Sequence, residues 1–99
     1  MNVTEHLIDC IAEESGEVVQ AAMKINRFHV DGCYPDGRGN VEVMVQELND
    51  LQAVVELLIE RGVELPGLGD RAAIEAKKKK VANMMLIAVR RGSLQVDTY

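Results

Sequence analysis

Four acidic residues in this sequence occur as two pairs, and the members of each pair lie three positions apart. Glu14 and Glu17 form the first pair, and Glu47 and Asp50 form the second. Residues three apart share one face of a helix, and Glu14, three positions after Ile11, would point along the apolar face of its helix. An ionised carboxylate inside a core is costly unless it is paired or coordinated. The spacing therefore indicates that these acids bind something.

Two helices that pack side by side through these faces would bring all four carboxylates within reach of one point. Oxygen ligands with no nearby His or Cys suit a hard divalent cation, and Mg²⁺ or Mn²⁺ is the predicted ion. Without an ion, repulsion would raise the pKa of at least one acid, so metal binding should be coupled to folding. Acids at this spacing also occur on solvated helix surfaces, but two pairs beside apolar stripes favour a site.

A di-iron carboxylate centre is an alternative interpretation of these acids. The sequence disfavours it, because such centres use Glu-x-x-His pairs. The chain has none, and its histidines are His6 and His29. His6 falls on the same helix flank as Glu13 and Glu17, which makes it a candidate for ligand contact. Capping or surface exposure is the commoner role of such a histidine.

The elements that must position these acids are helices, and we predict an all-α helical bundle. Apolar residues form 47% of the chain and aromatic residues 3%, which suits packed helices better than a β-sandwich. Glycine and proline gather in residues 28–40 and 62–70, the predicted connections. Helices are expected in the remaining segments, at about residues 4–27, 41–61 and 71–91.

Capping residues and apolar stripes support these three helices. The predicted N-caps are Thr4, Asn40 and Asp70, and Gly92 is the predicted stop of the last helix. Each helix carries one apolar stripe at helical spacing. The stripes are Leu7, Ile11, Val18, Ala21, Ala22 and Ile25; Met44, Leu48, Leu51, Val55, Leu58 and Ile59; and Ile74, Val81, Met85, Ala88 and Val89. Three amphipathic helices need a further surface, so we expect a homodimer or homotetramer.

Length and charge limit the possible functions. The 99 residues suit a single domain over residues 1–99. Sixteen acidic against eleven basic residues give a formal net charge of −5, which disfavours nucleic-acid and membrane partners. No apolar run approaches the roughly 20 residues of a membrane span, so a cytoplasmic protein is predicted. Cys10 and Cys33 have no zinc-site or disulfide spacing, so reduced thiols are expected.

The acidic motifs resemble those of a known family. EESGE at residues 13–17, followed by ELND at residues 47–50, resembles the EExxE and ExxD motifs of the MazG-like all-α nucleoside triphosphate pyrophosphohydrolases. The similarity covers most of the chain, since residues 13–28, 40–62 and 76–85 look like the three helices of small phage-type or bacterial-type members. Asn49 departs from the Gly that many relatives carry, and the tryptophan that stacks the base in some branches is absent.

The resemblance implies hydrolysis of a nucleoside triphosphate between its α and β phosphates, with Mg²⁺ as the usual cofactor. It implies that Glu13 assists or orients the attacking water. The metal ligands that it implies are Glu14, Glu17, Glu47 and Asp50. Direct attack by water is chemically sufficient, because a metal lowers the pKa of bound water and a carboxylate that is not a ligand can take the proton. The chain also lacks a Ser/His/Asp or Cys/His constellation for covalent catalysis.

Lysines are the candidate phosphate-binding residues. Residues 77–80 are four consecutive lysines that fan around a helix, so some must point toward its apolar stripe. The resemblance favours Lys77 and Lys80 for phosphate contact, with Lys24 as a third, and snorkelling surface lysines are the alternative. The glycines of residues 32–39 lack the Walker pattern and follow no strand, so this stretch is interpreted as a linker.

Other functions stay open on the sequence alone. A non-catalytic helical module could use the same metal to bind a nucleotide or a protein. A phosphoribosyl-ATP pyrophosphohydrolase would share the acidic helices, and an acidic helical scaffold would bind no metal at all. The preferred base and sugar, the number of metal ions and the choice between dimer and tetramer are not fixed by these residues.

Overall fold

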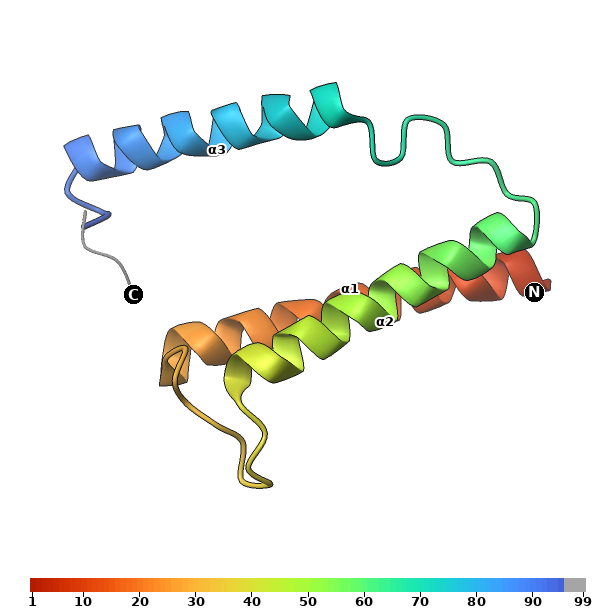
Figure 1. Cartoon of the computed structure of the whole chain (residues 1–99), viewed down its shortest axis with the longest axis horizontal. Coiled ribbons are helices and arrows are strands. Elements are labelled where there is room, and N and C mark those ends of the chain that lie inside the picture. The colour runs from red at the N-terminus through yellow and green to blue at the C-terminus, as the bar shows by residue number, and fades with distance from the viewer. Residues whose placement is uncertain (96–99) are drawn as a thin grey trace. The chain divides into compact units, whose positions relative to one another are not determined.

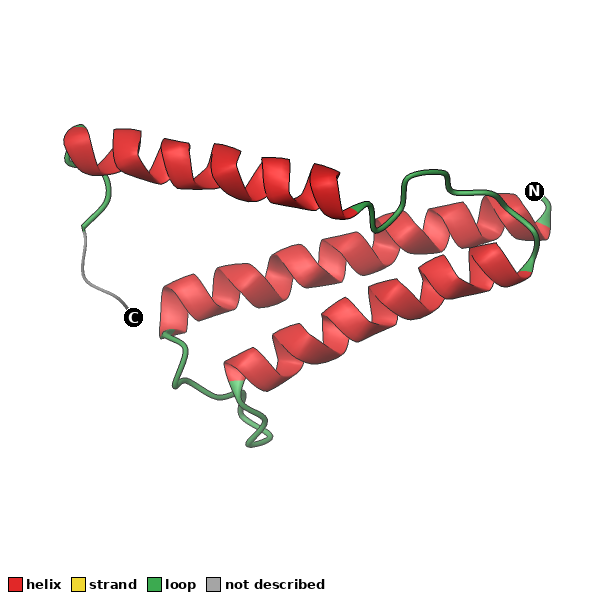
Figure 2. Cartoon of the chain, turned by 45° about the horizontal axis from the view of Figure 1, so that its top comes forward, coloured by secondary structure: helices red, strands yellow, loops and turns green. Residues whose placement is uncertain are grey.

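The computed structural model describes residues 1–95, which form three helices and no strand (Figure 1, Figure 2). The helices are α1 (Val3–Phe28), α2 (Asn40–Glu60) and α3 (Arg71–Arg90). The predicted all-α class is confirmed, and each helix bound lies within one residue of its expected position. Within this part of the chain, no helix has the length and apolar character needed to cross a membrane.

The chain divides into two compact units, Met1–Glu64 and Leu65–Tyr99. The first unit is a helical hairpin in which α1 and α2 run antiparallel and side by side (Figure 1). Both candidate acidic pairs belong to this hairpin. The second unit contains α3.

The core of the hairpin is formed by residues from one face of each helix. Ala21 and Ile25 of α1 and Val43 and Leu58 of α2 are buried. The predicted α1 stripe is confirmed, because its remaining residues are half-buried. The predicted α2 stripe is confirmed in part: Leu58 is buried and Met44, Leu51 and Val55 are half-buried, whereas Leu48 and Ile59 are 45% and 48% exposed. Buried Val43 and half-buried Glu47, Asp50 and Val54 extend the inward face to one side of that stripe. Apolar residues cover two adjoining stripes of α2, so periodicity alone could not choose the face that meets α1.

Local hydrogen bonds explain where the helices begin. The N-cap of α1 is Asn2 and not the predicted Thr4, because Asn2 and Glu5 form a capping box with N–H···O distances of 2.8 and 3.1 Å. The predicted N-cap of the second helix is also wrong, because Gly39 is the N-cap of α2 and Asn40 is its first residue. The Asn40 side chain instead donates to the carbonyl of His29 at 2.9 Å.

The second unit consists of α3 and its flanking turns. The predicted N-cap is confirmed, since the carboxylate of Asp70 accepts from the N–H of Ala72 at 3.3 Å. Gly92 follows the helix with a φ of 77°, a conformation that favours glycine after a helix C-terminus. No residue of α3 is buried, and its apolar residues Val81 and Met85 are 46% and 53% exposed.

Candidate metal centre and adjoining pockets

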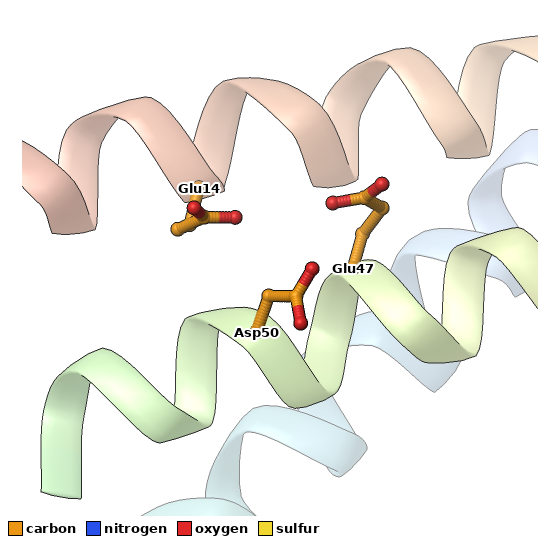
Figure 3. A group of neighbouring side chains, drawn as sticks. All are labelled: Glu14, Glu47 and Asp50. Carbon is orange, nitrogen blue, oxygen red and sulfur yellow. The ribbon is translucent and has the colours of Figure 1, made fainter.

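Three of the four predicted ligands converge between the helices of the hairpin. Glu14 projects from α1, and Glu47 and Asp50 project from α2 into the same space (Figure 3). One carboxylate oxygen of each lies within 4.8 Å of the chosen oxygens of the other two. All three side chains are half-buried. We call Glu14, Glu47 and Asp50 the acidic cluster.

The packing of α1 on α2 places these acids together. Glu47 and Asp50 lie between Val43 and Val54 on the inward face of α2, at intervals of three and four residues that keep them in line. Buried Val43 and Leu58 fix that face against α1. The acids therefore face α1 because the flanking apolar residues do.

Electrostatic repulsion in the cluster acts on Glu14. The pKa of Glu14 is raised, first by loss of hydration and then by the charges of Asp50 and Glu47, with smaller effects from Glu13 and Glu17. Both causes penalise the ionised carboxylate. A bound cation would offset this penalty, because its attraction for the three carboxylates opposes both their mutual repulsion and the loss of hydration.

The donor set fits a hard divalent ion. All three donors are carboxylate oxygens, the ligand type of Mg²⁺, Mn²⁺ and Ca²⁺. Two oxygens that bind one Mg²⁺ at about 2.1 Å can be at most about 4.2 Å apart, so oxygens spaced up to 4.8 Å need only a small side-chain rotation. Three protein ligands leave positions on an octahedral ion for water or a phosphate oxygen.

Glu13 and Glu17 occupy different places from the cluster. Both are exposed, and Glu17 lies outside the group of converging ligand atoms. Glu17 instead lines a pocket of about 180 Å³ together with Glu47. Its predicted role as a metal ligand, and that of Glu13 toward water, stay predictions.

We call this 180 Å³ space the polar pocket. It lies at the junction of α1, α2 and the loop between them. Its lining side chains include two acids, two cations and one tyrosine: Glu17, Glu47, Lys24, Arg38 and Tyr34. Glu47 belongs to both the polar pocket and the acidic cluster, so the two are contiguous. Lys24, predicted from the sequence, is thus close to the acids.

The loop at residues 29–39 brings Tyr34 and Arg38 to this pocket. A tight turn closes on itself through the N–H of Tyr34, which donates to the carbonyl of Arg38 at 2.7 Å. Asn40 anchors the loop to the end of α1, since its side chain donates to the carbonyl of His29, the C-cap of α1, at 2.9 Å. Its backbone N–H donates to the carbonyl of Gly32 within the loop, also at 2.9 Å. The segment is therefore an ordered part of the pocket, although the sequence predicted only a linker.

Sequence reasoning missed Tyr34 and Arg38 because neither belongs to a helix or to an acidic motif. The only available signal was an aromatic and a basic residue close together in a glycine-rich loop. That signal does not identify a site, because the turn that places both side chains depends on tertiary hydrogen bonds to Asn40.

A second pocket, of about 370 Å³, adjoins the polar pocket and shares Lys24 and Tyr34 with it. Its other lining residues are mainly apolar: Phe28, Cys33, Pro35 and Asn40. The acidic cluster, the polar pocket and this apolar pocket therefore follow one another along the hairpin, linked by shared residues.

The remaining predicted residues lie elsewhere. Nε2 of His6 is 3.6 Å from Sγ of Cys10, one helical turn away, and this histidine is not part of the acidic cluster or of the polar pocket. Cys10 and Cys33 are free thiols. Lys77 and Lys80 are in the second unit, where both line an apolar groove with Val81. Their predicted contact with phosphate stays a prediction.

Comparisons of the chain with protein-family models, with curated proteins and with solved structures gave no match. What the residues themselves define is an all-α chain with an acidic cluster that could hold a metal ion.

Proposed function

We propose that the protein is a metal-dependent nucleoside triphosphate pyrophosphohydrolase, which cleaves its substrate to a nucleoside monophosphate and pyrophosphate. The observation that carries this proposal is the convergence of Glu14, Glu47 and Asp50 within 4.8 Å between two packed helices. The resemblance of residues 13–17 and 47–50 to MazG-like motifs supplies the reaction class. Mg²⁺ is the proposed ion, with Mn²⁺ as a substitute.

The residues of the hairpin divide the chemical tasks between them. The acidic cluster holds the ion, which when bound neutralises phosphate oxygens and makes a coordinated water more acidic. Glu13 and Glu17, both exposed near the cluster, are the carboxylates available to accept a proton from the attacking water. Lys24 lies in the adjoining pocket, where it contributes positive charge toward the phosphates. No step needs a covalent intermediate on the protein.

Oligomerisation is part of the proposal. Helix α3 buries none of its residues, and a helix with an exposed apolar face gains its stability by packing that face against another surface. We propose that copies of the chain associate as a homodimer or homotetramer in a bundle of the MazG-like type. Lys77 and Lys80 on α3 are then the proposed phosphate contacts of the second unit.

The experiment is a screen of the purified chain against canonical and modified nucleotides, including phosphoribosyl-ATP, with Mg²⁺. Release of pyrophosphate is measured separately from release of orthophosphate. We expect pyrophosphate, and we expect Glu14→Gln or Asp50→Asn to reduce its rate by about 100-fold or more, in line with the loss of catalytic metal ligation. Glu56→Gln, which removes an exposed acid of α2 outside the cluster, should leave the rate unchanged.

Two outcomes would contradict the proposal. Binding of Mg²⁺ and nucleotide without any product would assign a non-catalytic binding module. A melting temperature that does not change with Mg²⁺ or Mn²⁺, together with no turnover, would assign a helical scaffold.

A further inference from the structure

The polar pocket holds two cations on one aromatic ring. Nζ of Lys24 lies 4.4 Å from the centroid of the Tyr34 ring, and Cζ of Arg38 lies 5.4 Å from the same centroid. Both distances are within the roughly 6 Å range of cation–π attraction. The ring therefore gathers two positive charges at the end of the hairpin.

These cations are not neutralised by the acids of their own pocket. Among residues 1–95, no ion pair within 4 Å joins Lys24 or Arg38 to Glu17 or Glu47. Arg38 pairs through Nε with the carboxylate of Asp36 at 2.9 Å. This contact orients the guanidinium, whose fork carries further N–H donors.

The polar pocket is too small for a whole substrate and can take only one group of a larger ligand. Sites for whole small molecules typically enclose about 300–1,000 Å³, whereas the polar pocket encloses about 180 Å³. Its shared residue Glu47 makes it contiguous with the acidic cluster. An anion in the pocket would thus lie beside an ion held by the cluster, and a guanidinium and an ammonium both suit phosphate.

We propose that Arg38 and Lys24 bind a phosphate group of a metal-bound polyphosphate in the polar pocket, and that Tyr34 is the positioning residue for both cations. The inference rests on the proposed function for the ion in the acidic cluster, and extends it to a loop residue that no acidic motif contains. The loop at residues 29–39 is then part of the binding site.

The test titrates the full chain with Mn²⁺ alone and with inorganic tripolyphosphate in saturating Mn²⁺, by calorimetry. Arg38→Gln and Lys24→Gln should each weaken tripolyphosphate binding by about tenfold or more, the loss expected for a charge-assisted hydrogen bond. Neither should change the affinity for Mn²⁺ alone by more than about twofold. The matched control is Arg27→Gln, which removes a cation from the end of α1 that does not line the pocket, and it should bind tripolyphosphate as the wild type does.

Tyr34 provides a second readout. Tyr34→Phe keeps the ring and should retain binding, whereas Tyr34→Leu removes it and should weaken binding as the cation variants do. Tripolyphosphate affinity in Arg38→Gln equal to that in Arg27→Gln would overturn the inference, as would absence of tripolyphosphate binding by the wild type. A melting curve for each variant confirms that it is folded, and Lys24→Gln, judged against the same Arg27→Gln control, decides the inference if Arg38→Gln unfolds.

Failure of this inference is distinguishable from failure of the proposed function. If no nucleotide is hydrolysed but the titrations follow the expectation, the phosphate site stands and the enzymatic proposal falls. If nucleotides are hydrolysed and Arg38→Gln keeps the wild-type KM and kcat, the proposed enzymatic function is supported and the proposed phosphate site is wrong.

Discussion

Glu14 both packs in the interface between the two helices of the hairpin and belongs to the acidic cluster. It is half-buried against α2, and its neighbours in the cluster carry the same charge. Loss of hydration, followed by the charges of Asp50 and Glu47, raises its pKa. In the folded chain the ionised form of Glu14 is therefore disfavoured. This is typical of a carboxylate metal ligand when no cation is bound.

The raised pKa predicts how metal-free stability depends on pH. The folded chain binds the Glu14 proton more tightly than the unfolded chain, whose pKa is near the ordinary 4.5. The contribution of this group to the free energy of unfolding is therefore greatest below pH 4.5 and is lost as the pH rises through the folded pKa. In a chelator at pH 7, Glu14→Gln should melt at a higher temperature than the wild type, and the difference should shrink toward pH 4.

Circular dichroism melts between about pH 4 and 7 check this expectation, with Glu56→Gln as a control whose difference from the wild type should not follow the same trend. In saturating Mn²⁺ at neutral pH, the wild type should instead melt at a higher temperature than Glu14→Gln. An ion at 100 times its Kd adds about 2.7 kcal/mol to the free energy of unfolding of the wild type. The free energy of unfolding of Glu14→Gln should increase much less. Identical melting of wild type and Glu14→Gln in chelator would contradict the electrostatic account.

A substitution of Glu17 distinguishes a metal site with three protein ligands from one with four. The MazG-like motif predicts Glu17 as a ligand, but its carboxylate lies outside the converging group. We expect Glu17→Gln to weaken Mn²⁺ binding by less than about threefold, and Glu14→Gln by more than about tenfold, in a direct Mn²⁺ titration. Equal losses in the two variants would show that Glu17 joins the ion.

At the scale of elements, the loop at residues 29–39 is held by close contacts with the end of α1. A Cβ at Gly32 would lie 2.5 Å from Nδ2 of Asn40 and 2.6 Å from the carbonyl oxygen of Phe28. Those two atoms belong to the region that anchors the loop, where Nδ2 of Asn40 donates to the carbonyl of His29. The loop therefore needs glycine for space, and a change there should also disturb the polar pocket.

The same substitution at two glycines should have opposite effects on stability. Gly32→Ala should cost about 1–3 kcal/mol because of overpacking, whereas Gly16→Ala should stabilise α1 by up to about 1 kcal/mol because alanine is the better helix former. A Cβ at Gly16 would meet nothing within 4 Å. Thermal denaturation of both variants in chelator checks the pair. A Gly32→Ala variant as stable as the wild type would contradict the close packing of Gly32 against Asn40 and Phe28.

At the scale of the whole molecule, the second unit by itself buries no residue of its helix α3, so the apolar face of this helix needs a further surface. Val81 and Met85 line two apolar grooves along it, and Lys77 borders both. Exposed apolar surface of this kind is typical of an interaction site. This is the physical basis for the proposed self-association.

We predict that the wild type is a dimer or tetramer by size-exclusion chromatography with light scattering. Val81→Asp should shift the molar mass toward that of the monomer, because it places a charge in the apolar groove. Asn83→Asp adds the same charge at an exposed α3 position that lines neither groove, and it should leave the mass unchanged. A monomeric wild type at high concentration would contradict self-association.

The sequence by itself determined the three helices, their bounds and three of the residues that converge. Helical periodicity, glycine and proline punctuation and acidic spacing are local properties, so they are readable without tertiary contacts. They also placed Glu14 on the inward stripe of α1, where it is found. They predicted the wrong cap for α1, because Asn2 and Glu5 form a capping box that Thr4 cannot.

Only the tertiary structure decided how far the inward face of α2 extends, and that Glu17, of the four predicted acids, lies outside the converging group. Two apolar stripes compete on α2, and the packing of Val43 and Leu58 turns Glu47 and Asp50 inward and leaves Leu48 exposed. Arg38 reaches the polar pocket through a loop whose shape depends on hydrogen bonds that join its two ends, from Asn40 to the carbonyls of His29 and Gly32. Such choices are set by which surfaces bury one another, and local sequence patterns do not contain that information.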